Sequence, residues 1–170
     1  MRRLDGWIAG ALVAAALGLA GLLGARVVTF RTLEPFGGPV TGREPFAAFR
    51  GRVERCDLTR NRLYVAGWIA RAGTPRARHA TRVLLRDASD GRFWQLPTDL
   101  PARLDVTARL ARELNDGVDY TTSGFAASVD LRKSAPRIDA GRVFIAYDAG
   151  GERAGLGYIL VPTRCEVTPA

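Results

Sequence analysis

The sequence is poor in the residue types that carry most metal and acid-base chemistry. Among its 170 residues it has one histidine, two cysteines and one methionine, and Lys133 is the only lysine among 25 basic residues. Two isolated cysteines and the single His79 make a poor ligand set for a transition metal. We therefore expect neither a metal site nor a cofactor.

Motifs of the common enzyme classes are also missing. The chain has no G-x-S-x-G nucleophile elbow, no H-E-x-x-H pair, no P-loop and no dinucleotide-binding glycine fingerprint. His79 lies in the polar stretch "TPRARHATR", which is typical of a solvated loop rather than of a general base. Aspartates in turns could hydrolyse a glycosidic bond in pairs, but they more often cap the turns; the candidates are Asp87, Asp90, Asp99, Asp116, Asp119, Asp139 and Asp148. We predict a non-catalytic protein, with a secreted enzyme as the weaker alternative.

The one long uncharged run is at the N-terminus. Residues 6–25 follow two arginines and carry no charge, and at about 1.5 Å per residue they are long enough to cross a bilayer core. Trp7 and Arg26 stand where interfacial residues belong. We predict that residues 1–30 form a single signal-anchor transmembrane helix. The alternative is a cleaved signal peptide, since Gly18-Leu19-Ala20 offers small residues to a signal peptidase.

Small residues recur at every fourth position of this run, at Gly6, Gly10, Ala14 and Gly18. A helix face without bulk lets a second helix approach closely, so the spacing predicts packing against a membrane protein partner. The alternative is that glycine and alanine are simply common in such segments. Arginines flank the run on both sides and do not settle its orientation.

A proline- and glycine-rich stretch, residues 31–45, follows the apolar run and predicts an extended linker. The folded domain is then expected to span residues 46–170. Cys56 and Cys165 lie near its two ends, in stretches that both resemble strands. We predict a disulfide between them in an oxidising compartment, with two buried free thiols as the alternative.

Short strands account for most of the domain. Residues 63–70 alternate, with Leu63, Val65 and Ile69 on one face and Tyr64 and Trp68 on the other. Further strands are expected at 51–58, 82–87, 92–96, 123–131, 141–148 and 157–163, with a hairpin turn at Gly91 and a tight turn in "DAGGE". About seven strands with frequent turns predict a mainly β fold, an antiparallel immunoglobulin-like sandwich; a closed barrel is the alternative.

One helix interrupts the strands in the stretch "RLDVTARLARELNDG". Val106, Leu110 and Leu114 are spaced along one helix face, Asp105 is a candidate N-cap and Gly117 a candidate terminator. One apolar stripe opposite a charged face predicts a short helix that covers an end or edge of the sheets.

Four stretches carry a resemblance to a known module: "VAGWIA" at 65–70, "RLDV" at 103–106, "SGFAASVDL" at 123–131 and "GRVFIAYD" at 141–148. In this order they resemble the β-sandwich modules attached to bacterial membrane glycosyltransferases and other surface-polysaccharide biogenesis proteins. The resemblance runs from Gly51 to the last strands, and its motifs are short. It implies a fold and a cell-envelope setting, and it transfers no catalytic residue.

Aromatic and basic side chains are the candidates for ligand binding. Flat rings complement the C–H faces of sugars, although the usual place of aromatic side chains is the core. Trp94, beside Phe93 and Arg92, is the ring that we most readily place at the surface, and even there packing is favoured over ligand binding. Arg76 and Arg78 belong to a basic loop that could meet acidic glycans or lipid headgroups. The net charge of +8 comes from scattered arginines, and without a nucleic-acid-binding motif we expect no nucleic acid partner.

These features together predict a single-pass protein of the bacterial inner (plasma) membrane with a periplasmic or extracellular domain. It would act as a non-catalytic accessory or glycan-binding component of envelope polysaccharide biogenesis. The alternative is a structural subunit of a membrane complex, recruited through its glycine-rich helix and the surface of its sandwich.

Overall fold

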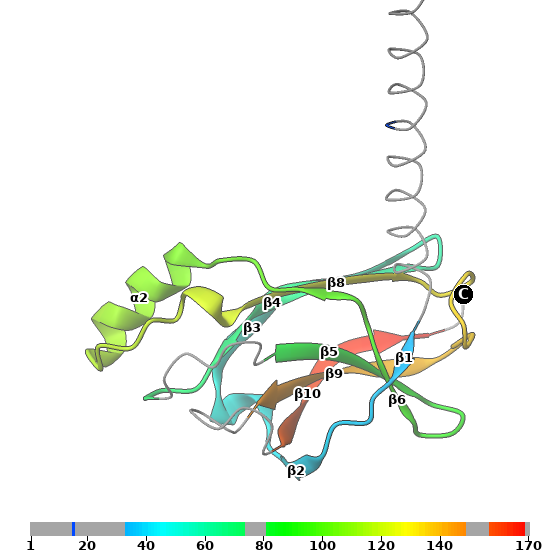
Figure 1. Cartoon of the computed structure of the whole chain (residues 1–170), viewed down its shortest axis with the longest axis horizontal. Coiled ribbons are helices and arrows are strands. Elements are labelled where there is room, and N and C mark those ends of the chain that lie inside the picture. The colour runs from blue at the N-terminus through cyan, green and yellow to red at the C-terminus, as the bar shows by residue number, and fades with distance from the viewer. Residues whose placement is uncertain (1–14, 16–32, 74–80, 149–156, 169–170) are drawn as a thin grey trace, which may run out of the picture.

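The computed structural model describes residues 33–73, 81–148 and 157–168, together with Ala15. Within these residues the protein is mainly β, with two sheets and one α-helix (Figure 1). None of the helices in the described part of the chain combines the length and the apolar character that a bilayer crossing requires. The predicted membrane helix at 1–30 and its small-residue face lie outside the described residues except for Ala15, so both stay predictions.

The seven strands expected from the sequence are all present. They are β3 (Arg50–Thr59), β4 (Arg62–Ala70), β5 (Thr81–Asp87), β6 (Phe93–Gln95), β8 (Gly124–Asp130), β9 (Gly141–Asp148) and β10 (Tyr158–Val167). The turn between β5 and β6 has Gly91 at a φ of 72°, as predicted. The expected turn in "DAGGE" falls outside the described residues.

Two sheets share these strands. The larger has the order β1-β6-β5-β9-β10-β2, and the smaller has the order β3-β4-β8-β7, where β7 is the short strand Thr98–Asp99. All pairs are antiparallel except β10 with β2. The chain crosses from one sheet to the other between β6 and β7. There the Thr98 hydroxyl accepts a hydrogen bond from the amide of Val83, 3.2 Å away, which ties β7 to the larger sheet.

Residues 33–45 differ from the predicted linker. Glu34–Pro35 form β1, which pairs with β6, and Val40–Arg43 form β2, which pairs with β10 at the opposite edge of the same sheet. Leu33 is buried in the core and Phe36 packs on the outer face of the sheet. The prolines suit this role because edge strands tolerate a missing N–H donor. The described part of this segment therefore belongs to the folded domain.

The main core lies between the two sheets. Leu63, Val65 and Ile69 of β4 face it, as their alternation predicts, opposite Val83 and Val143 of the larger sheet. Gly67 occupies the same face where β3 has a bulge between Val53 and Arg55. A Cβ at Gly67 would collide with the backbone oxygen of Arg52 and the ring of Phe125, so only glycine fits there.

The predicted helix is α2 (Leu104–Leu114), and it builds a second cluster on the outer face of the smaller sheet. Val106 and Leu110 are buried against Trp68, as the apolar stripe predicts. The predicted caps are wrong. Arg103 is the N-cap residue, Asp105 lies inside the first turn, and Asn115 ends the helix in the left-handed conformation with its amide bonded to the Ala111 carbonyl.

The domain has two dissimilar ends (Figure 1). At one, which we call the helix end, α2 packs on the C-terminal part of β4. The other, the arginine end, contains the β3–β4 turn at Arg60 and Asn61, residues 131–139 between β8 and β9, and the last residues of β10. Strand pairing places these segments together, because Arg62 faces Asp130 and Val167 faces Gly141 in the ladders.

Candidate functional site

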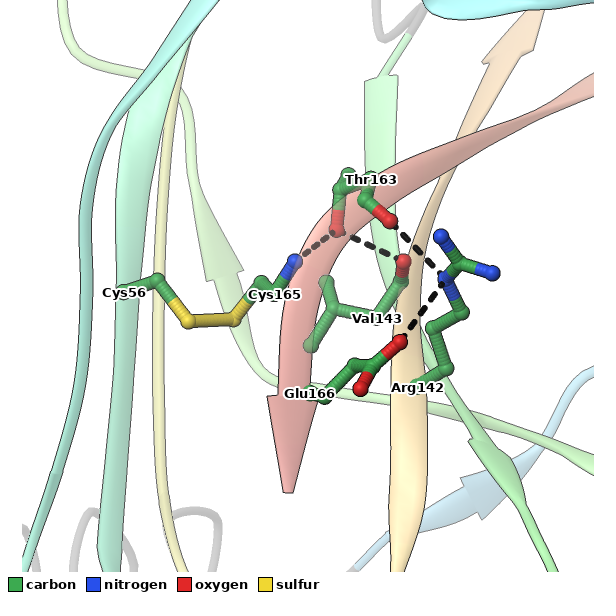
Figure 2. The surroundings of a disulfide bond; sticks show 6 residues. All are labelled: Cys56, Arg142, Val143, Thr163, Cys165 and Glu166. Atoms are coloured by element: carbon green, nitrogen blue, oxygen red, sulfur yellow. Dashed lines mark hydrogen bonds and ion pairs between the residues drawn. A yellow bond between two sulfur atoms is a disulfide. The ribbon is translucent and has the colours of Figure 1, made fainter. Parts of the chain in front are cut away.

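The predicted disulfide is present and joins the two sheets. Cys56 of β3 and Cys165 of β10 are bonded, with their Cα atoms 5.8 Å apart and 109 residues between them in sequence (Figure 2). Cys165 is buried and Cys56 is exposed. Closing so long a loop disfavours the unfolded chain by about 4 to 5 kcal/mol in the chain-entropy model.

A local break in β10 aims Cys165 at the other sheet. The ladder with β9 shifts register between Pro162 and Glu166. In this gap the Thr163 hydroxyl donates to the Val143 carbonyl at 2.8 Å and accepts from the Cys165 amide at 3.1 Å (Figure 2). The side chain thus replaces the lost ladder bonds, and the strand can bend toward β3 without leaving its polar groups unpaired.

The predicted aromatic pair in β6 points in two directions. Trp94 turns inward, where it packs against the main core and its indole N–H has no hydrogen-bond partner in the described residues. Phe93 turns outward and meets Phe144 edge to face, with ring centroids 5.2 Å apart. Neighbouring strand residues face opposite sides of a sheet, so the two rings cannot form one surface. The expectation that Trp94 would be the exposed ring is therefore corrected.

Arg92 is engaged by its own neighbours. Its Nε lies 2.6 Å from Asp90 and its guanidinium lies 5.6 Å from the centre of the Trp94 ring. Arg76 and Arg78 lie outside the described residues, although Gly73 and Thr81 on either side of that loop are described. The prediction for these two arginines is therefore neither supported nor contradicted by the structure.

The outer face of the larger sheet carries an aromatic and polar cluster that includes Phe93, one of the ligand-binding candidates predicted from the sequence. Arg82 of β5 donates to the Tyr158 hydroxyl at 2.9 Å and to the Gln95 side-chain oxygen at 2.6 Å. Phe36 packs edge to face on Tyr158, with centroids 5.3 Å apart, and Phe93 completes the row. All five side chains are half-buried. We call Phe36, Arg82, Phe93, Gln95 and Tyr158 the aromatic platform. Its three rings flank the Gln95 amide and the Arg82 guanidinium, which hydrogen bonds hold in place.

A cleft of about 260 Å³ opens at the arginine end. Apolar side chains and three arginines line it together with polar neighbours: Leu58, Arg60, Asn61, Leu131, Arg132, Arg137, Ile138, Asp139, Val167 and Thr168. Leu58 and Val167 each lie two residues beyond a bonded cysteine. The disulfide therefore holds together the two walls of this cleft, which come from different sheets.

A second hollow adjoins this cleft, and Arg60 lines both. It lies over β3 and β4 and is lined by Arg55, Asp57, Thr59, Arg60, Arg62, Tyr64 and Asp130. Here Arg55 bonds Asp57 at 2.7 Å and stacks over Tyr64 at 4.9 Å. No signal in the sequence pointed to either hollow, since their residues come from separate turns.

The helix end, in contrast, holds a compact ion-pair triad. Arg103 donates two hydrogen bonds to Glu54 of β3, both 2.9 Å, and two to Asp105 of α2, at 2.9 and 2.8 Å. Hydrogen bonding by Arg103 lowers the pKa of Asp105 to about 2. The same bonds raise the pKa of Arg103 above its usual range. This pattern fixes the start of the helix on β3.

A tyrosine and a carboxylate link the segment that follows α2 to the residues that follow β4. The Tyr120 hydroxyl donates to Oδ2 of Asp116, and the Gly73 amide donates to the Tyr120 hydroxyl oxygen at 3.3 Å and to the same Asp116 oxygen at 3.2 Å. Burial, followed by the hydrogen bond to Asp116, raises the pKa of Tyr120 to about 12. The phenol is therefore neutral in the physiological range and acts as a structural donor.

Several aspartates act as turn caps. Asp87 accepts from Ser89, Asp90 from Arg92 and Asp119 from Thr121, each over two residues. This agrees with the turn-capping interpretation of these residues. No group of three or more potential metal ligands occurs in the part of the chain that the structure describes.

Comparison with known proteins returned no match of any kind: no protein-family model, no curated protein and no solved structure is similar to this chain. The resemblance to modules of polysaccharide biogenesis proteins is therefore a prediction from the sequence motifs alone.

Proposed function

We propose that this protein is a membrane-anchored, extracytoplasmic and non-catalytic component of cell-envelope polysaccharide biogenesis, whose domain binds a glycan. The aromatic platform is the observation that carries the proposal. Half-buried rings offer flat faces to sugar C–H groups, and a guanidinium fixed by Tyr158 and Gln95 retains donors for sugar hydroxyls. We also propose that the two-sheet domain is of the immunoglobulin-like class, which the shared core and the disulfide between the sheets support.

The proposed compartment rests on the disulfide. Structural disulfides persist in the periplasm and outside the cell and are rare in the cytosol. The proposed anchor is the apolar run at residues 6–25, preceded by two arginines. Both features agree with a cytoplasmic N-terminus and an exterior domain.

Glycan binding is tested with the full-length protein in detergent on an array of bacterial envelope polysaccharides. We expect binding that Arg82→Gln weakens roughly tenfold, since hydrogen bonds to a charged group contribute about 1.5 to 3 kcal/mol. Phe93→Ala should weaken it as well. Arg112→Gln, on the exposed side of α2, is the matched control and should bind normally.

A uniformly negative array would reject glycan binding. If a membrane protein then copurified with the chain, and replacement of residues 6–25 by a polyleucine span abolished that association, the structural-subunit alternative would hold instead. Proteolysis of intact spheroplasts separately tests the compartment. An exterior domain is digested from outside, whereas a protected domain with two free thiols would contradict the proposed location.

A further inference from the structure

The arginine end has cationic side chains that the other described residues do not neutralise. Within the described ranges, Arg60 and Arg132 have no ion pair, and Arg137 meets Asp139 at 3.1 Å with both side chains about 70% exposed. Exposed pairs of this kind contribute little. The three guanidinium groups therefore surround one cleft, and the described residues use little of their hydrogen-bonding capacity.

The shape and lining of the cleft select the ligand class. Its volume of about 260 Å³ is smaller than the roughly 300 Å³ at which pockets for drug-sized molecules begin, so it suits a small group rather than an oligosaccharide. Arginine forks match the oxygens of a phosphate group. The apolar wall formed by Leu58, Leu131 and Ile138 suits the hydrocarbon part of an amphipathic ligand.

The chain enters the folded domain at this same end. The Leu33 amide donates to the Ala135 carbonyl at 3.3 Å, and Ala135 belongs to the segment between β8 and β9 that lines the cleft. The uncharged run ends at Ala25, so only seven residues separate it from Leu33. Seven residues span at most about 25 Å, which keeps this end of the domain close to the bilayer surface.

We infer that the arginine cleft binds the phosphate of an anionic phospholipid headgroup in the anchoring membrane, so that the domain rests on the bilayer with its arginine end down. The inference rests on the membrane anchor of the proposed function. It assigns to the cleft a role separate from the aromatic platform. Each basic residue near an anionic leaflet strengthens the binding of a protein to the membrane surface roughly fivefold.

The test uses the full-length protein in lipid nanodiscs of phosphatidylcholine, with or without phosphatidylglycerol, and measures amide hydrogen exchange. We expect slower exchange at residues 58–61 and 131–139 in the anionic discs only. The double variant Arg60→Gln/Arg132→Gln should lose most of this protection. The control Arg109→Gln/Arg112→Gln removes the same charge from the helix end and should retain it.

The outcomes separate the two proposals. A chain that enters neither type of disc refutes the anchor, and this inference with it. A chain that enters both and exchanges equally in both refutes the inference alone. Protection by soluble glycerol phosphate in neutral discs, without further protection in anionic discs, would identify a free-phosphate site and overturn the assignment to lipid.

Discussion

The two ends of the domain are held by different forces. At the helix end, packing of Leu110 on Trp68 and the triad around Arg103 close the structure without a covalent bond, and the charges of Arg103, Glu54 and Asp105 are paired with one another. At the arginine end a disulfide holds two sheets together beside an open cleft, where Arg60 and Arg132 stay unpaired within the described residues. The difference indicates that noncovalent contacts hold the helix end, whereas the arginine end is fixed covalently and can present charge to a ligand.

Removal of the disulfide should have the largest effect. We expect Cys56→Ser/Cys165→Ser to lower the free energy of unfolding by about 4 to 5 kcal/mol, because the unfolded chain regains the entropy of a long open loop. Urea denaturation measures the change. A loss of less than about 1 kcal/mol would mean that noncovalent contacts suffice at the arginine end too, and would remove the contrast between the ends.

The second prediction compares apolar residues at the two ends. Leu110→Ala, in a side chain only 1% exposed, should cost about 2 to 4 kcal/mol of unfolding free energy because it leaves a cavity under α2. Leu58→Ala, in a side chain 39% exposed at the cleft, should cost less than about 0.5 kcal/mol. Equal costs would show that the cleft wall is packed as tightly as the helix.

The third prediction compares arginines. Arg103→Gln should lower stability by about 1 to 2 kcal/mol, since Glu54 and Asp105 both lose hydrogen bonds to a charged donor. Arg132→Gln should leave stability within about 0.5 kcal/mol of the parent, because it has no partner to lose among the described residues. Thermal unfolding of both variants beside the parent measures the difference, and a costly Arg132→Gln would show that this residue is structural.

The smallest expected effect is a loss of unfolding free energy at acidic pH, which arises at the helix end. The folded-state pKa of Asp105 is lowered from 3.8 to about 2 by Arg103. A lowered pKa contributes stability above the unfolded value and loses it as the pH falls through the folded value. We therefore expect the parent to lose stability between about pH 4 and pH 2 by a larger amount than Asp105→Asn. Urea denaturation at the two pH values checks this, and parallel losses in both proteins would rule out the ion pair as the cause.

Much of the secondary structure was predictable because its causes are local. The alternation in β4 and the four-residue spacing of Val106, Leu110 and Leu114 follow from the geometry of a strand and of a helix. The caps of α2 were less predictable, since Asp105 could act as a cap or as an ion-pair partner, and only the position of Arg103 decides between them.

The amino-acid sequence by itself determined seven of the strands, the helix and the presence of two cysteines that could bond. The tertiary structure decided that Trp94 faces the core, that residues 33–45 join the larger sheet at both edges, and that Arg60, Arg132 and Arg137 meet at one cleft. The reason is the range of the interactions. Periodicity is set within a few residues, whereas strand order and register bring distant turns together, and no local pattern encodes which turns become neighbours.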